Sequence, residues 1–323
     1  MAKILLFGRS GQLGWELARR LEPLGELTVA GSAEVDFARP EAIRAAVRTA
    51  QPSVIVNAAA YTAVDKAESE PDCAWAINAE APGVLAEEAA RMGSLLVHYS
   101  TDYVFDGVKT EPYIEADPSN PLSVYGKTKL GGEQAIARAM AGSDGRWLIF
   151  RTSWVYGARG SNFLFTMLRL AQERSELRIV DDQIGAPTSS EAIAQATADI
   201  LARVFAGDCP PIGAGSQPAP GAPPPIPPSE WSGIYHLTCS GAVSWFGFAK
   251  EFLTLTAEST GAALPTLIPI PSAEFPRPAR RPANSRLCCE LLRATFGVTL
   301  PPWQEALERV LEQIHGQVGE TLP

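Results

Sequence analysis

Three glycines near the start of the chain constrain its fold more than any other feature. Gly8, Gly11 and Gly14 lie between a short apolar segment, residues 3–7, and an amphipathic segment, residues 13–21. In a strand–turn–helix unit the first glycine allows a sharp turn, the second lets a pyrophosphate approach the backbone, and the third lets the helix pack closely. The phosphates then lie against unpaired N–H groups at the helix N-terminus. The spacing therefore predicts a dinucleotide site in a Rossmann-type fold.

The first half of the chain alternates between short β-branched segments and longer helical ones. Strands that are apolar on both faces and separated by helices form a parallel sheet that is covered on each side. The predicted fold class is therefore α/β, with a doubly wound, parallel-sheet Rossmann domain over residues 1–150. We expect its strands at residues 3–7, 27–30, 54–57, 95–99 and 147–151, and its helices at residues 13–21, 40–50, 72–92 and 123–141.

The regular alternation ends near residue 151. The pattern predicts helices at residues 162–174, 190–205 and 245–256 and a strand at residues 234–237. We interpret residues 151–323 as a smaller, irregular α/β region that binds the substrate and crosses back to the Rossmann domain. Residues 209–229 contain nine prolines and three glycines, and such a segment favours neither a helix nor an interior strand. It is predicted to be a flexible insertion, with a proline-rich partner motif as the alternative.

Composition excludes several classes of protein. The 323 residues are 46% hydrophobic and 20% charged, which allows a sizeable core, and no apolar run approaches the roughly 18 residues of a membrane span. A formal net charge of −9 argues against nucleic acid as a partner. The five cysteines lack the spacing of metal ligands. We therefore expect a cytoplasmic protein with reduced thiols that binds neither nucleic acid nor a membrane.

The choice of dinucleotide depends on the end of the second strand. Residues 30–32 contain no carboxylate for the ribose 2′-hydroxyl of NADH, although Glu34 and Asp36 follow shortly. Arg9, inside the glycine loop, could pair with the 2′-phosphate of NADPH. The sequence favours NADPH and leaves NADH open.

Tyr125, Lys129 and Thr101 are the candidate catalytic residues. Tyr125 and Lys129 are spaced i and i+4, so they project from the same face of a helix. A nearby ammonium favours a phenolate and would lower a phenol pKa of about 10 towards the working range. Thr101 follows the fourth strand, where the carboxyl ends of parallel strands border a ligand crevice. This triad predicts proton transfer to a polarised carbonyl group.

These motifs resemble the extended short-chain dehydrogenase/reductases, in which the G-x-x-G-x-x-G spacing is usual, and within them the family of dTDP-4-dehydrorhamnose reductases. The similarity spans almost the whole chain except the proline-rich insertion. It implies that a nucleotide sugar, dTDP-4-dehydro-L-rhamnose, is reduced at its C4 keto group by NAD(P)H. The similar segments are residues 5–17, 56–68, 98–105, 124–132, 150–156, 182–188 and 281–287.

The resemblance also implies a set of binding residues. A flat indole such as that of Trp154 suits a sugar ring, and the charges of Arg281 and Arg286 suit a diphosphate. The implied cofactor contacts, in addition to Gly8, Arg9 and Gly14, are Gly11, Gln12, Leu13, Asp36, Phe37, Ala59, Ala60, Tyr61, Thr62, Tyr99, Tyr125 and Lys129. The implied substrate contacts are Thr101, Asp102, Tyr125 and Trp154, and Arg281 and Arg286 are added to them because of their charge alone.

Some members of the resembled family bind Mg²⁺ through glutamates at a dimer interface. The matching positions are Glu16, Glu191 and Glu290, and three carboxylates can hold a hard cation. A homodimer and a Mg²⁺ site are therefore further expectations. His98, inside a buried strand, is interpreted as a packed histidine rather than a ligand.

Two other functions remain open. A sugar-nucleotide epimerase or 4,6-dehydratase shares the tyrosine and lysine, but dehydratases commonly place an acidic pair after the threonine. Thr101 is instead followed by Asp102 and Tyr103, which favours simple reduction. A non-catalytic, dinucleotide-binding regulatory subunit, such as the one in methionine adenosyltransferase, is the other alternative. The presence of Thr101, Tyr125 and Lys129 favours an enzyme, because a pure binding subunit does not need them.

Overall fold

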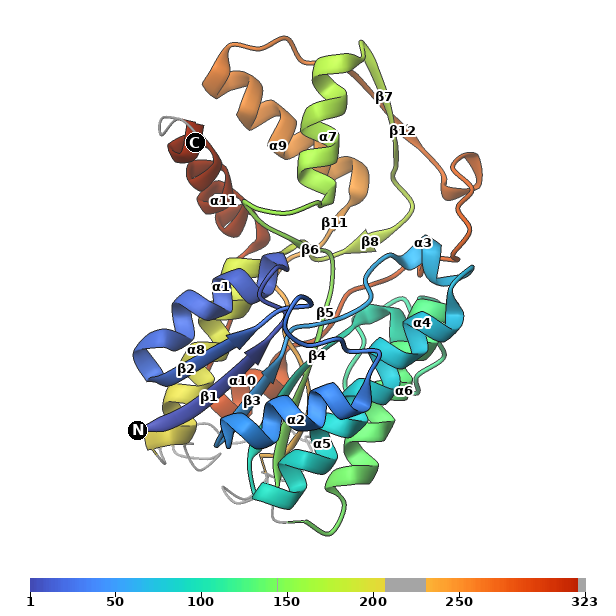
Figure 1. The fold of residues 1–323 in the computed structure, drawn as a ribbon. Coiled ribbons are helices and arrows are strands. Elements are labelled where there is room, and N and C mark those ends of the chain that lie inside the picture. The colour runs from blue at the N-terminus through green and yellow to red at the C-terminus, as the bar shows by residue number, and fades with distance from the viewer. Residues whose placement is uncertain (144, 207–230, 319–323) are drawn as a thin grey trace.

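The centre of the protein is a six-stranded parallel sheet with the strand order β10-β5-β4-β3-β1-β2 (Figure 1). We describe it in a computed structural model, in which residues 1–143, 145–206 and 231–318 are placed. The predicted α/β fold is confirmed. The five strands predicted in the first half have the same bounds or are one or two residues longer at an end, and the strand predicted at residues 234–237 begins and ends one residue earlier. The strands are β1 (Ala2–Phe7), β2 (Gly25–Ala30), β3 (Val54–Asn57), β4 (Leu95–Thr101), β5 (Arg146–Thr152) and β10 (Gly233–His236).

Alternate side chains of the strands enter two separate hydrophobic cores. Leu5, Ile55 and Leu96 face one core, which also contains Ile43 and Leu85 from the covering helices. The intervening residues of the same strands face the other core, which is closed by helices that include α1 and α8. The two layers are visible in Figure 1, and they explain why these strands are apolar on both faces.

The helices agree with the predicted ones in the first half, with two differences. The short helix Val64–Ala67 was not predicted. Residues 72–92 do not form a uniform α-helix, because a π-helical turn, Ala76–Glu80, separates two α-helical parts. Gly132 permits this turn to pack closely on α6, since a Cβ atom there would lie 2.2 Å from the backbone oxygen of Asn78. The helices of this half are α1 (Gln12–Leu21), α2 (Pro40–Ala50), α3 (Val64–Ala67), α4 (Pro71–Trp75), α5 (Ala81–Met92) and α6 (Val124–Met140).

The second half of the chain contributes to both regions. Helix α8 (Ser190–Ala206) packs on α1, and β10 extends the sheet beside β5. Helix α10 (Glu290–Phe296) packs beside β10, and the other remaining elements lie beyond one end of the sheet (Figure 1). They are α7 (Phe163–Glu173), α9 (Trp245–Thr260) and the strand pair β7 (Glu176–Val180) and β12 (Thr266–Ile270), with the short strands β6 (Val155–Tyr156), β8 (Ile184–Gly185), β9 (Thr188–Ser189) and β11 (Val243–Ser244), and the C-terminal helix α11 (Trp303–Val318).

Some sequence expectations about this half were incomplete. The strands β7 and β12 and the helices α10 and α11 were not predicted, and the division of the chain at residue 150 stays a prediction. The proline-rich segment, residues 209–229, lies outside the described residues. Within the described ranges, no helix combines the length and the apolar character that crossing a bilayer requires, and Cys73, Cys239, Cys288 and Cys289 have free thiols.

Candidate active site

The glycine loop has two positions that the chain itself requires to be glycine. Gly8 has a φ of +97°, and a Cβ atom there would lie 2.6 Å from the backbone carbon of Ala58. A Cβ atom on Gly14 would lie 2.0 Å from the oxygen of Gly8. At Gly11 the nearest atom would be 3.4 Å away, which is ordinary contact. The protein packing therefore explains Gly8 and Gly14, and it leaves space above Gly11.

The start of α1 is also open to an anion. Helix α1 begins after Gly11 and has no side-chain cap, so its first N–H groups have no partner within the helix. Gln12 does not reach them. Its amide donates to the carbonyl of Val155 over 3.2 Å and accepts from Asn162 over 3.3 Å. The predicted phosphate-binding end of α1 is thus formed by backbone, with Gln12 directed at β6.

The end of β2 carries both signs of charge. Glu34 accepts a hydrogen bond from the backbone of Gly31 over 2.7 Å, and Asp36 accepts one from Ala38 over 2.9 Å. Arg9 is exposed and has no ion-pair partner in the described part of the chain. Phe37 is buried and packs edge-on against Phe7, so it belongs to the core and exposes little surface to an adenine ring.

The backbone after β3 is held by two asparagines. Asn57 accepts a hydrogen bond from the N–H of Ala59 over 3.1 Å. Asn78, in the π-helical turn, accepts from the N–H of Tyr61 over 2.9 Å and donates to its carbonyl over 3.0 Å. π-helical turns of this kind are frequent at functional sites. Sequence analysis missed Asn78, and it fixes the segment 59–62 that was expected to contact the cofactor.

Helix α6 approaches the end of β4 closely at its first turn. Ser123 caps the helix by accepting a hydrogen bond from the N–H of Gly126 over 3.1 Å. A Cβ atom on Gly126 would lie 2.3 Å from the oxygen of Tyr103, so only glycine allows this approach. Tyr125 therefore lies beside the turn Asp102–Val104 that follows β4, with its ring edge-on to Tyr103 at 5.4 Å.

The surroundings of the Tyr125 phenol raise its pKa. Burial raises its pKa above the usual value, the nearby Asp102 carboxylate raises it further, and hydrogen bonding to Thr101 opposes both effects. Lys129 is not among the groups that dominate this shift. The expectation that the Lys129 ammonium lowers the Tyr125 pKa therefore stays a prediction.

The Lys129 ammonium is directed at β4. Its Nζ donates to the carbonyl of Tyr99 over 2.7 Å and lies 3.2 Å from Nε2 of His98. Burial lowers the pKa of Lys129 to about 8, and Glu133 opposes this effect. The i, i+4 spacing placed Tyr125 and Lys129 on one face of α6, but a buried lysine also needs a hydrogen-bond acceptor, and the carbonyl of Tyr99 on β4 supplies one.

Asp102 is a buried carboxyl group next to Thr101. Thr101 donates to its Oδ1 over 3.0 Å, and Oδ2 has no hydrogen-bond partner among the described residues. Burial raises the pKa of Asp102 to about 6, partly opposed by Ser285 and Thr101. A buried, half-satisfied carboxyl group in this place is typical of a functional site.

Trp154 has an unusual conformation and an aromatic partner. Its φ is +49°, which is rare for a bulky side chain. Its indole is stacked on that of Trp245 with ring centroids 3.6 Å apart. Gly185 makes room for this indole, since a Cβ atom there would lie 2.5 Å from it. One face of Trp154 is thus covered by Trp245, a residue that the sequence did not single out.

The two arginines expected at a diphosphate are held differently. Arg281 pairs with Asp65 of α3 over 3.2 Å, and Arg277 pairs with the same carboxylate over 2.5 Å. Arg281 also lowers the pKa of the buried Tyr103 phenol through its charge and a hydrogen bond, against the larger opposite effect of burial. Arg286 instead donates to the carbonyl of Thr110 and to the side chain of Asn284. Only Arg281 is therefore linked to the turn that follows Thr101.

The three predicted metal-binding glutamates do not fit a Mg²⁺ site within this chain. Burial and Glu191 raise the pKa of Glu16, so those two residues are near each other. Glu191 is bonded to Arg20 and Gln313, both over 2.8 Å, and Glu290 pairs with Arg293 over 2.5 Å. No group of three or more potential ligands is present in residues 1–143, 145–206 and 231–318. We therefore assign no step to a metal.

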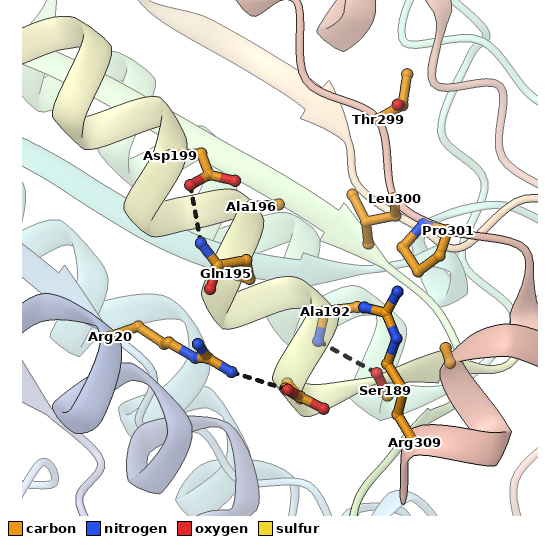
Figure 2. Close-up of a pocket in the computed structure, with 12 residues that line it drawn as sticks. Arg20, Ser189, Ala192, Gln195, Ala196, Asp199, Thr299, Leu300, Pro301 and Arg309 are labelled. Atoms are coloured by element: carbon orange, nitrogen blue, oxygen red, sulfur yellow. Dashed lines mark hydrogen bonds and ion pairs between the residues drawn. The ribbon is translucent and has the colours of Figure 1, made fainter.

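A cavity of about 410 Å³ lies next to Glu191. Figure 2 shows Arg20 of α1 reaching towards α8 on one side and Arg309 of α11 on the other. The cavity lies among α1, α8 and α11. Thr101, Tyr125 and Lys129 belong to β4 and α6, and none of them lines the cavity. This cavity is therefore separate from the candidate active site.

The fold and the site together define a class of protein. A parallel, doubly wound sheet carries a glycine turn after β1 and a threonine at the end of β4, and a Tyr-x-x-x-Lys segment opens α6. These are the features of the extended short-chain dehydrogenase/reductases. A family model described as the RmlD substrate binding domain matches residues 2–212 and 222–315.

Comparison with known proteins places the chain more narrowly. The dTDP-4-dehydrorhamnose reductase of Burkholderia thailandensis is 49% identical over 308 residues, which cover 94% of this chain and 96% of that protein. The dTDP-4-dehydrorhamnose reductase of Escherichia coli strain K12 is 44% identical, with 96% and 97% covered. A crystal structure of dTDP-4-dehydrorhamnose reductase from Bacillus anthracis in complex with NADP is similar with a TM-score of 0.81 at 30% identity, covering 97% of this chain and 99% of that one. The chain belongs to the dTDP-4-dehydrorhamnose reductase family.

Proposed function

We propose that this protein reduces the C4 keto group of dTDP-4-dehydro-L-rhamnose with NADPH, which gives dTDP-L-rhamnose. The observation that carries the proposal is the hydrogen-bond contact between Thr101, at the end of β4, and Tyr125, in the first turn of α6. Lys129 lies one turn further along the same helix. A hydroxyl donor and a phenol at the carboxyl edge of a parallel sheet suit a carbonyl substrate.

The residues present fit an NADP cofactor. The space above Gly11 and the uncapped start of α1 suit a pyrophosphate. Among the described residues Arg9 has no ion-pair partner, and it lies at the end of the sheet where a 2′-phosphate would bind. Lys129 and the backbone of residues 59–62 would hold the nicotinamide end. When bound, the nicotinamide supplies the hydride.

The protein's own residues would then handle the carbonyl oxygen. Thr101 polarises the carbonyl group through its hydroxyl, and Tyr125 donates a proton to the oxygen as negative charge develops there. Such donors accelerate the reaction because they bind the transition state more strongly than the ground state. Trp154, Asp102 and the two arginines Arg281 and Arg286 are the proposed substrate contacts. Oligomeric state stays a prediction.

Steady-state oxidation of NADPH tests the proposal. The substrate is generated in situ by the preceding enzymes of dTDP-rhamnose synthesis, and absorbance is followed at the nicotinamide band. We expect stoichiometric oxidation that depends on the sugar nucleotide. Sugar-nucleotide conversion without net oxidation would indicate an epimerase or dehydratase, and cofactor binding without turnover would indicate a regulatory subunit.

A further inference from the structure

His98 is the buried neighbour of Lys129 that the proposed reaction does not use. It lies on β4 opposite Asn57 of β3, and both side chains are about 1% exposed. Its Nδ1 is 3.0 Å from Nδ2 of Asn57, and its Nε2 is 3.2 Å from Nζ of Lys129. The three side chains therefore form one continuous row from β3 through β4 to α6.

The direction of the hydrogen bonds in this row is set at Asn57. The N–H of Ala59 donates to Oδ1 of Asn57, which fixes the carbonyl end of the amide. The NH₂ end consequently faces His98 and donates to Nδ1. A neutral imidazole has one N–H and one acceptor nitrogen, so an accepting Nδ1 leaves the proton on Nε2.

The Nε2–H group then points at Lys129. An ammonium group has three donors and no acceptor, so a protonated Lys129 faces a second donor at 3.2 Å. A free amine has a lone pair and accepts this hydrogen bond, while it can still donate to the carbonyl of Tyr99. If the imidazole takes the other tautomer, the same conflict moves to Asn57, and the row satisfies every group only when Lys129 is neutral.

We propose that Asn57 and His98 act as positioning residues that lower the proton affinity of Lys129 by presenting an N–H group to its amine. The charged group that acts on Lys129 in the described chain is Glu133 of α6, which is itself paired with Arg151 of β5 over 2.6 Å. The imidazole stays neutral, because burial and Lys129 hold the pKa of His98 well below its usual value. A Lys129 pKa of about 8 agrees with this arrangement.

Nitrogen NMR tests the tautomer without cofactor or substrate. The chain contains only three histidines, so the ring signals of His98 in the ¹⁵N-labelled full-length protein can be assigned with His98→Gln. At pH 9 we expect a neutral ring with the proton on Nε2, whose shifts move between pH 7 and 9 as Lys129 titrates. A ring protonated on Nδ1 at pH 9, or an imidazolium above pH 7, would overturn the proposal.

Enzyme kinetics test whether His98 lowers the proton affinity of Lys129, and this experiment rests on the proposed function. The amide of His98→Gln reaches the Nε2 position and can turn its oxygen to the ammonium, so we expect the alkaline limb of kcat/KM to rise by about one pH unit. In the comparison variant His98→Asn the shorter amide ends at the Nδ1 position, so the N–H group is removed without a new acceptor for Nζ and the limb should rise by less. Equal limbs in the wild type and both variants would contradict the proposal. Absence of reductase activity would remove the kinetic arm and leave the NMR result decisive.

Discussion

The indole of Trp154 lies flat on the indole of Trp245, with ring centroids 3.6 Å apart and planes 9° from parallel. Trp154 follows the carboxyl end of β5, and Trp245 is the first residue of α9. The stack therefore joins the carboxyl end of the sheet to the smaller region. The φ of +49° at Trp154 indicates that this orientation is held against a backbone preference. Trp245 therefore fixes a side chain that is proposed to contact the sugar.

Replacing Trp245 with alanine should weaken substrate binding more than turnover. An aromatic pair of this kind contributes about 0.5–1.5 kcal/mol beyond the area it buries, which corresponds to a rise in KM for the sugar nucleotide of about 2- to 13-fold. Steady-state kinetics with varied sugar nucleotide measure this. Trp245→Phe keeps a ring in place and is the matched control, with a KM close to that of the wild type. An unchanged KM in Trp245→Ala would show that the stack does not orient Trp154 for substrate.

Tyr125→Phe should retain cofactor binding and lose most of its turnover. Removal of a general acid costs about 10²- to 10⁴-fold in rate, and the phenyl ring still packs against Tyr103. Single-turnover oxidation of NADPH and fluorescence titration of the cofactor measure the two effects. Tyr103→Phe is the control, because Tyr103 is the ring beside Tyr125 and its phenol interacts with Arg281. Full activity of Tyr125→Phe would exclude the phenol as the proton donor.

Much of the sheet could be predicted because its signal is local. Strands such as β3, which is buried throughout, are short apolar segments between helices, and the pattern carries that information directly. β8, β9 and β11 have only two residues each, which is too short for any periodicity. The π-helical turn at Ala76–Glu80 depends on packing against Gly132 and has no signal in the sequence of its own helix.

The candidate site was predicted only in part for a related reason. Thr101 and Tyr125 lie in recognisable motifs, and the end of β4 and the start of α6 bring them together. The partners of Lys129 depend on which strand faces α6, and a histidine in an apolar strand resembles ordinary core packing. His98 and Trp245 act through contacts between distant segments, and a single sequence contains no pattern for such contacts.

Arg9→Ala should change the preference between the two cofactors. If Arg9 pairs with the 2′-phosphate, its removal loses a charge-assisted bond worth about 1.5–3 kcal/mol, so KM for NADPH should rise about tenfold or more. KM for NADH should stay the same, because NADH lacks that phosphate. The control is Arg169→Ala, which removes one positive charge from α7, where Arg169 pairs with Glu173. Equal effects on both cofactors would exclude a specific contact with the 2′-phosphate.

Asp102 should make the protein less stable as pH rises through the weakly acidic range. Its pKa is about 6 in the folded protein against the ordinary value of 3.8, so between these values the folded state binds the proton more strongly than the unfolded state. The stabilising contribution of Asp102 to the free energy of unfolding is therefore fully present below pH 3.8 and is lost as pH rises to about 6. Two pKa units at about 1.36 kcal/mol each give a cost of roughly 3 kcal/mol at neutral pH.

Asp102→Asn removes this cost, because the amide does not ionise. Urea unfolding at pH 4.5 and pH 7.5 should show that the variant gains stability relative to the wild type as pH rises, by about 2 kcal/mol between the two values. Asp106→Asn is the control: hydrogen bonds from Asn120, Val108 and Tyr113 lower the pKa of Asp106, so its carboxylate is ionised at both pH values. That variant should lose the same stability at each pH. A difference between wild type and Asp102→Asn that is independent of pH would mean that Asp102 ionises in the folded protein as readily as in the unfolded chain.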